Sequence, residues 1–98
     1  LSVHDSIFDY IVTLIEKTRN SEYFALGASP RGANSLLRMS RAMALLSGRN
    51  YVVPDDIEAV FTAVLGHRVK LSSRARANGF TVDTALEEVR KSVKLPRT

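Results

Sequence analysis

The residues with the clearest chemical potential are five consecutive ones, Gly27-Ala28-Ser29-Pro30-Arg31. They combine a flexible glycine, a serine typical of helix caps, a proline suited to the first helical position and an arginine directly after it. A helix start presents unpaired backbone N–H groups and the positive end of the peptide dipoles. Arg31 adds a permanent charge whose planar donors match phosphate oxygens. The segment therefore predicts a site that holds or senses an anion, with a nucleotide phosphate as the favoured ligand.

The five residues also predict a local geometry. We expect Pro30 to begin a helix, where its missing N–H would have had no partner in any case. The Ser29 hydroxyl is expected to accept a hydrogen bond from a backbone N–H of the first turn. For Gly27 and Ser29, loop geometry and capping are favoured over direct contact with a phosphate.

Length and composition indicate one domain with a small core. The 98 residues include no cysteine, which excludes disulfides and thiolate metal sites and is consistent with a reducing compartment. No apolar run approaches the roughly 18 residues that span a bilayer. The chain begins at Leu1, without an initiator methionine or the pattern of a signal peptide. We therefore expect residues 1–98 to form a single domain excised from a longer, cytoplasmic protein that has no membrane partner.

The charge balance is modestly basic. Lys and Arg number 14 against 10 Asp and Glu, a net charge of +4, and ten of the basic residues are arginine. This balance suits an acidic partner such as a phosphate or a nucleic acid. The alternative for many of these arginines is a solvated surface.

Four helices are expected to position the anion site, because their apolar residues recur with helical spacing. Their expected bounds are Ser2, as a cap, to about Asn20; Pro30 to about Ser47; Pro54 to about Leu65; and a last helix that is capped by Thr81 or Asp83 and ends before Pro96. Short extended connectors over residues 21–28 and 50–53 join them. The sequence predicts an all-α fold, a small four-helix bundle.

The second of these helices has two distinct faces. The apolar face is expected to be buried and carries Leu36, Met39, Met43 and Leu46. The opposite side gathers polar and basic residues, namely Arg31, Asn34, Arg38 and Arg41. The anion site would then lie at one end of a solvent-facing basic row.

Two basic stretches carry no predicted site. His67 and Arg68 follow an apolar stripe, but the further ligands of a metal site are missing, so none is predicted and a helix-terminal hydrogen bond or a domain contact is favoured for His67. Residues 70–79 are polar and basic and are expected to form a solvated loop. Nucleic-acid binding there is disfavoured because no aromatic residues alternate with the charges.

Four ordered blocks give the chain a family resemblance. They are Thr18-Arg19; Leu26-Gly27-Ala28-Ser29-Pro30-Arg31-Gly32-Ala33; Leu45-Leu46-Ser47-Gly48-Arg49-Asn50-Tyr51-Val52-Val53-Pro54-Asp55-Asp56-Ile57; and Val64-Leu65-Gly66-His67-Arg68. Together they resemble the C-terminal helical lid domain of MoxR-type AAA+ ATPases, over about residues 7 to 93. Val53 stands where the family often has threonine, a difference that affects helix capping.

The resemblance implies a role for Arg31. In AAA+ ATPases, ATP binds between an α/β core and the lid, and an arginine at the start of a lid helix, the second sensor, reaches the γ-phosphate. Arg31 occupies that position and is the implied catalytic and cofactor-binding residue, with Ser29 and Gly27 beside it. Tyr10 and Ile11 lie on the first helix, which in such lids often packs near adenine, although core packing is the favoured role of both.

The resemblance also implies partners. These are the AAA+ core domain of the same chain, which would hold Mg²⁺; the neighbouring subunits of a ring, usually of six; and proteins with von Willebrand A domains as clients. Arg38 and Arg41 would meet a neighbouring subunit or the core, or lie in solvent. Because the chain lacks a G-x-x-x-x-G-K-[ST] loop, we do not expect it to hydrolyse ATP alone. The alternatives are a small basic helical domain that binds nucleic acid and the lid of a chelatase-like AAA+ relative.

Overall fold

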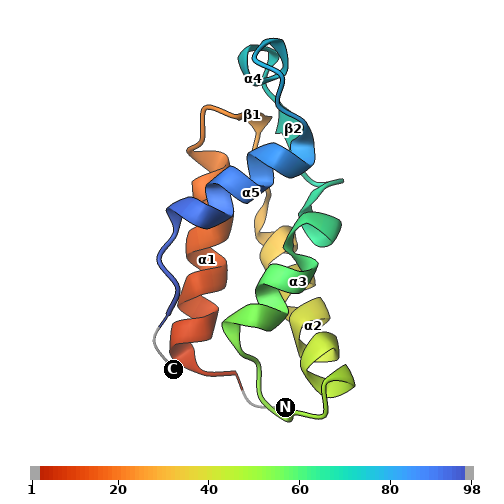
Figure 1. Cartoon of the computed structure of the whole chain (residues 1–98). Helices are drawn as coiled ribbons and strands as arrows, with labels where there is room; N and C mark the ends of the chain where they lie inside the picture. The colour runs from red at the N-terminus through yellow and green to blue at the C-terminus, as the bar shows by residue number, and fades with distance from the viewer. Residues whose placement is uncertain (1–2, 97–98) are drawn as a thin grey trace.

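The computed structural model describes residues 3–96 and is built mainly of helices (Figure 1). In chain order the elements are α1 (Asp5–Arg19), β1 (Phe24–Leu26), α2 (Pro30–Leu46), α3 (Pro54–Leu65), β2 (Lys70–Leu71), α4 (Ser73–Ala77) and α5 (Val82–Ser92). The molecule is elongated, with principal extents of 42 × 21 × 20 Å. The predicted all-α class is confirmed, with one short helix and a two-stranded sheet added to the four expected helices.

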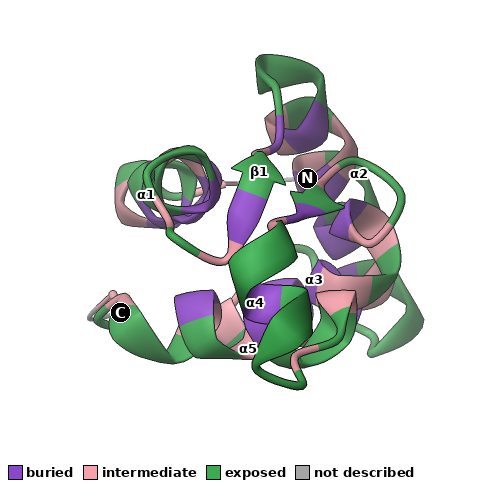
Figure 2. Ribbon diagram, turned by 90° about the horizontal axis from the view of Figure 1, so that it is seen from above, coloured by how far each residue is buried: buried purple, intermediate pink, exposed green. Residues whose placement is uncertain are grey.

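The four long helices share one core. α2 and α3 form a helical hairpin, α1 packs beside α2, and α5 crosses both α1 and α3 (Figure 1). Each helix turns its buried residues towards this centre, while exposed residues cover the outer surfaces (Figure 2). The largest side chains that are fully buried come from all four helices: Ile7, Ile11, Leu14, Leu36, Ile57, Phe61, Leu65 and Leu86. Burial of each contributes about 1.5–3 kcal/mol, so this shared core holds the bundle together.

The stretch 70–79 is not the solvated loop that its polarity predicts. Phe24 in β1 pairs with Leu71 in β2, and the two strands run antiparallel. The Ser72 backbone N–H then donates to the Tyr23 carbonyl oxygen at 2.8 Å, and the Ser72 hydroxyl accepts from the Ala75 N–H at 3.1 Å. That hydroxyl cap begins α4. The prediction was wrong because the pairing joins residues about 50 positions apart, which local composition does not reveal.

The buried face of α2 is also rotated from the predicted one. The fully or nearly buried residues are Gly32, Leu36, Ser40 and Ala44, spaced four apart. By contrast, Met39 is 46% exposed and Leu46 84% exposed. Small side chains let α2 lie close to its neighbours, and the buried Ser40 hydroxyl is satisfied by donating to the Leu36 carbonyl oxygen at 2.7 Å. Close packing of α2 against the neighbouring helices, rather than the burial of Met39 and Leu46, therefore determines which face of α2 is buried.

The ends of α1 and α5 refine the predicted caps. Ser2 lies outside the described residues, and His4 holds the cap position of α1, where its Nδ1 accepts from the Ser6 backbone N–H at 3.1 Å. For α5 the cap is Thr81, whose hydroxyl accepts from the Thr84 N–H at 3.1 Å. Within residues 3–96, no helix is both long enough and apolar enough to traverse a lipid bilayer.

Candidate anion site at the start of α2

The start of α2 has the backbone geometry that the sequence predicts, but not the predicted side-chain cap. Pro30 is the first helical residue, and Ser29 holds the cap position with extended backbone angles. The Ser29 hydroxyl makes no capping hydrogen bond; instead the Gly32 N–H donates to the Ser29 carbonyl oxygen at 2.8 Å. This backbone bond occupies a donor that the hydroxyl would have used, so that prediction was wrong. Among the hydrogen bonds of residues 3–96, none uses the Arg31 N–H.

A buried threonine ties the loop before α2 to the end of α1. Thr18 is fully buried, and its hydroxyl donates to the Ile15 carbonyl oxygen at 2.7 Å. The same oxygen accepts from the Ala28 backbone N–H at 2.9 Å. Ala28 itself is fully buried. Because both hydroxyl functions are used in the interior, the loop has little freedom to move relative to α1.

Two glycines allow the backbone segments around the site to approach closely. A Cβ on Gly27 would lie 2.5 Å from the Arg19 Cα and 2.7 Å from the Thr18 carbonyl carbon, both backbone atoms. A Cβ on Gly32 would lie 3.2 Å from the Ala28 Cβ and 3.3 Å from the Leu65 Cδ2. Gly27 therefore serves loop geometry, as predicted, and Gly32 seats the first turn of α2 against the core.

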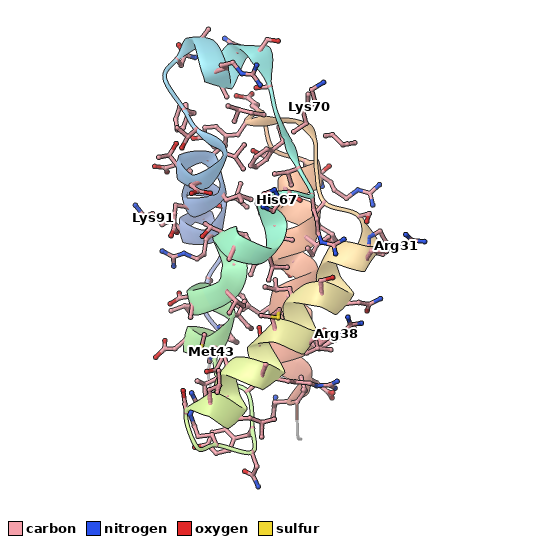
Figure 3. All side chains as sticks on the ribbon, turned by 90° about the vertical axis from the view of Figure 1, so that its right-hand side faces the viewer. Arg31, Arg38, Met43, His67, Lys70 and Lys91 are labelled. Atoms are coloured by element: carbon pink, nitrogen blue, oxygen red, sulfur yellow. The ribbon has the colours of Figure 1, made fainter. Side chains whose placement is uncertain are left out.

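Arg31 projects from this fixed support into solvent. The side chain is exposed and points away from the body of the molecule (Figure 3). In the part of the chain that the structure describes, no ion pair involves Arg31, and the first turn of α2 contains no acidic residue. Arg38 and Arg41 are exposed further along the same helix. The site combines a rigid backbone with a guanidinium that has no partner within residues 3–96.

The two residues predicted near adenine lie apart from this site. Ile11 is fully buried and Tyr10 is 4% exposed, both in the core that α1 forms with the other helices. Tyr10 and Thr18 are separated by eight helical residues, or about 12 Å along α1. The Tyr10 hydroxyl is buried without a hydrogen-bond partner among residues 3–96. Burial, with a smaller contribution from Glu58, raises the pKa of that hydroxyl.

Sequence reasoning missed an ion pair at the start of α3. The Arg49 guanidinium donates to both Asp56 carboxylate oxygens at 2.7 Å, and Asp56 also accepts from the Val53 backbone N–H at 2.8 Å. Arg49, and secondarily the Val53 N–H, hold the pKa of Asp56 below its usual value. A signal for part of this arrangement was present in the sequence. Val53 cannot cap the helix with its side chain, and Asp56 stands at the third helical position, from which a carboxylate can accept a hydrogen bond from the N–H of the cap residue.

His67 and Arg68, which follow α3, form no metal site in the described part of the chain. His67 and Arg68 are both exposed, and His67 lines an open cavity of about 410 Å³ with Thr62, Gly66 and Asp83. Within residues 3–96, no group of three or more His, Cys, Asp or Glu side chains is placed to bind a metal ion. The anion site at α2 therefore remains the candidate functional site.

The fold and this site agree with one domain family. The family profile of the AAA lid domain matches residues 16–89, which include the α2 start, and the chain belongs to this family. A crystal structure from Cytophaga hutchinsonii, described as that of a candidate ATPase, superposes with a TM-score of 0.87 at 30% sequence identity. The match covers 98% of this chain and 32% of that one.

The relatives specify the type of lid. The uncharacterised protein YeaC of Bacillus subtilis is 40% identical over 92 residues, which is 94% of this chain. Chaperone MoxR1 of Mycobacterium tuberculosis is 34% identical over 104 residues, 97% of this chain. The protein MoxR of Methylorubrum extorquens is 56% identical over a shorter stretch of 45 residues. The domain is thus a MoxR-type AAA+ lid, and it spans 29% and 28% of the lengths of the first two relatives.

Proposed function

We propose that this domain acts as the lid over ATP bound to the AAA+ core of the same protein, and that Arg31 contacts the γ-phosphate. The observation that carries the proposal is the exposed Arg31 side chain, which has no ion-pair partner within residues 3–96 and stands on a helix start fixed by Thr18 and Gly27. A rigid support matters because a charge stabilises a transition state only when it is already in place as the reaction begins. Mg²⁺ would be held by the core.

Arg31 would contribute in two ways. Charge spreads over the oxygens of the transferred phosphoryl group, and a guanidinium close to them lowers the barrier. The same contact favours the closed position of the lid while the γ-phosphate is present, and it weakens once phosphate leaves. Nucleotide state would thereby control the angle between lid and core, because the contacts of Thr18 and Gly27 join the loop before Arg31 to α1 and would make the lid move with the arginine.

The remaining predicted site residues would support this contact from different distances. Ser29 and Gly27 belong to the loop, and the Arg31 backbone N–H, which has no acceptor among residues 3–96, would be a main-chain donor to the phosphate. Tyr10 borders an open cavity of about 320 Å³, but its hydroxyl is buried, so it would shape an adenine site by packing rather than by direct contact. Ile11 would act only through packing, since it is fully buried.

The proposal extends to the assembly. Neighbouring subunits would form a ring, usually of six, and the exposed Arg38 and Arg41 on α2 would face an adjacent subunit or the core. The complete protein would hydrolyse ATP and remodel client proteins as a chaperone, with von Willebrand A domain proteins as the expected clients. One relative, MoxR1 of Mycobacterium tuberculosis, is named as a chaperone.

The test is Arg31→Ala in the complete protein that carries this domain. We expect ATP turnover to fall at least tenfold, because one donor to a developing charge is typically worth that much or more. Steady-state kcat and KM for ATP, together with the affinity for a non-hydrolysable analogue, separate the effect on chemistry from that on binding. Thermal unfolding of the variant should match the wild type, since the Arg31 side chain makes no ion pair within residues 3–96.

Lys91→Ala provides the matched control. Lys91 is exposed on α5, on the opposite side of the molecule from Arg31, and its removal changes the net charge by the same amount (Figure 3). Turnover of this variant should stay within twofold of the wild type. Wild-type turnover by an assembled Arg31→Ala ring would exclude the proposed role of Arg31.

A further inference from the structure

The short helix α4 is firmly attached to one end of the bundle, although it adds little to the core. Ala75 is the one buried residue among its five, and the others are exposed. Its cap residue Ser72 is fixed twice to the segment before β1, through its N–H to the Tyr23 carbonyl oxygen and through its hydroxyl to the Glu22 carbonyl oxygen at 2.9 Å. α4 projects beyond the long helices (Figure 1). α4 is therefore firmly attached but buries little surface, which leaves its outer side free to contact a partner.

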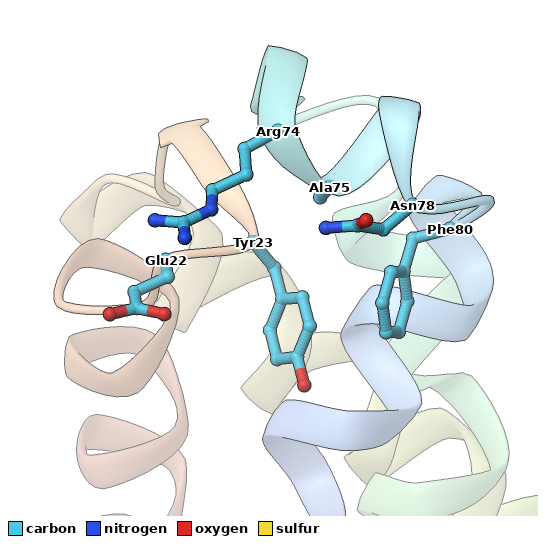
Figure 4. Close-up of a pocket in the computed structure, with 6 residues that line it drawn as sticks. All are labelled: Glu22, Tyr23, Arg74, Ala75, Asn78 and Phe80. Carbon is cyan, nitrogen blue, oxygen red and sulfur yellow. The ribbon is translucent and has the colours of Figure 1, made fainter.

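Beside α4 lies a cavity that combines aromatic and polar groups. Its volume is about 260 Å³, and it is lined by Glu22, Tyr23, Arg74, Ala75, Asn78 and Phe80 (Figure 4). The Tyr23 and Phe80 rings are half-buried and pack against each other, with centroids 4.7 Å apart and planes tilted by 55°. The volume lies below the roughly 300 Å³ at which small-molecule pockets begin, so the cavity suits one side chain of a larger partner.

The chain segment that carries α4 is basic, and Arg74 from this segment lines the cavity. Between Glu58 and Asp83 the sequence has no acidic residue but contains Arg68, Lys70, Arg74 and Arg76, all of them exposed. In the described part of the chain, neither Arg74 nor Arg76 takes part in an ion pair. Glu22 is the single acidic residue that lines the cavity. The resulting field attracts anionic partners.

We infer that this cavity and the exposed arginines of α4 form a docking site for an acidic segment of another protein. An apolar or aromatic side chain of the segment occupies the cavity against Tyr23 and Phe80. Carboxylates on either side of it meet Arg74 and Arg76, and the Asn78 amide bonds the peptide backbone. The site is separate from Arg31, so the inference does not depend on the role proposed for that residue.

A single-stranded nucleic acid fits these groups less well. Strand binding uses ring faces that are open to stacking along a groove that follows the phosphates. Here the two rings pack against each other, and they line one small cavity rather than a groove. The geometry therefore favours a protein segment.

The experiment uses the 98-residue chain and a fluorescein-labelled nonapeptide of four Glu, one Phe and four Glu. Binding is followed by fluorescence anisotropy at 50 mM salt. Replacing Arg74 and Arg76 together by Ala should weaken binding about tenfold, as expected for two exposed ion pairs. Replacing the peptide Phe by Gly should weaken it at least as much, because the cavity is then left empty. Glu22→Gln should tighten binding two- to threefold by removing the opposing charge.

The matched control is the double variant Arg38→Ala and Arg41→Ala, which loses the same charge from exposed positions on α2. Its affinity for the peptide should remain within twofold of the wild type. An equal loss in both double variants would overturn the inference, because it would show attraction by net charge alone. The inference would also be overturned if a nine-nucleotide oligothymidylate bound more tightly than the peptide through Arg74 and Arg76. Absence of peptide binding at 1 mM would overturn it as well. Circular dichroism of each variant confirms that the fold is retained.

Discussion

The starts of α2 and α3 have the same backbone design and opposite electrostatics. Each has proline at the first helical position after a cap residue whose side chain does not cap. In each, the N–H of the third helical residue donates to the carbonyl oxygen of the cap residue, at 2.8 Å from Gly32 and 3.0 Å from Asp56. At α3 the Asp56 carboxylate then reaches back to the Val53 N–H and binds Arg49. At α2 the same position is Gly32, which has no side chain to do so.

The difference supports the role proposed for the start of α2. At α3 the buried Asp56 carboxylate is paired with the Arg49 guanidinium and the Val53 N–H, so these groups are satisfied within the domain. At α2 the positive end of the helix, the Arg31 N–H and the Arg31 guanidinium have no acidic partner among residues 3–96. The polar groups at the start of α3 are thus paired within the domain, whereas the equivalent groups at the start of α2 are not. Unpaired N–H donors and an unpaired positive charge are what a site for an external anion requires.

Removing the closing carboxylate at α3 should have the largest effect on folding. Asp56 is 2% exposed and holds three hydrogen bonds, so Asp56→Ala leaves the Val53 N–H and the facing guanidinium without their partner. We expect the loss of Asp56 to lower the free energy of unfolding by about 3 kcal/mol. Urea denaturation of the 98-residue chain measures it. A change below 0.5 kcal/mol would mean that the α3 start is as open as the α2 start.

The same carboxylate gives the α3 start a pH signature. The folded-state pKa of Asp56 lies below its unfolded value near 3.9, so its stabilisation is complete above that value and is lost as the pH falls through the folded pKa. The difference in stability between the wild type and Asp56→Asn should be constant from about pH 5 to 7 and should shrink in more acidic solution. The α2 start, with no acid in its first turn, contributes no such term.

A side chain at Gly27 should disturb the start of α2 by displacing the loop that holds it against α1, without changing any charge. The Cβ of Gly27→Ala would lie 2.5 Å from the Arg19 Cα, so the loop or the end of α1 must shift. We expect a destabilisation of about 1–3 kcal/mol, typical of overpacking. ATP turnover of the complete protein should fall by more than this loss of stability explains, because Arg31 moves with the loop. Gly48→Ala shows the cost of backbone strain without a steric clash, since its φ is +78° and nothing lies within 4 Å of its Cβ position.

Particular residues show how far sequence reasoning reaches. The long helices and the α2 start follow from apolar spacing, from Pro30 and from the run around Ser29, all of which act locally. The role of Gly27 in loop geometry was predicted, but the contact that requires it, with the backbone of Arg19, appears only once α1 and the loop are folded together. The β1–β2 pairing and the exposure of Leu46 likewise depend on how distant segments meet, whereas the Arg49–Asp56 pair spans seven positions and had a local signal.

Placing a carboxylate at the open helix start should change stability and function in opposite directions. Asp at position 29 can accept from the Arg31 N–H, which has no acceptor among residues 3–96, and it also interacts favourably with the helix dipole. Ser29→Asp should therefore raise the free energy of unfolding by about 0.5–1 kcal/mol. Its negative charge would occupy the place proposed for the γ-phosphate, so turnover in the complete protein should fall several-fold.

Ser29→Asn separates the two effects, because asparagine caps about as well as aspartate but carries no charge. It should stabilise the domain to a similar extent while turnover stays close to the wild type. If both variants lose turnover equally, the backbone N–H of Arg31 itself is the group that contacts phosphate. If neither loses turnover, the open start of α2 faces no anion, and its contrast with the closed start of α3 concerns folding alone.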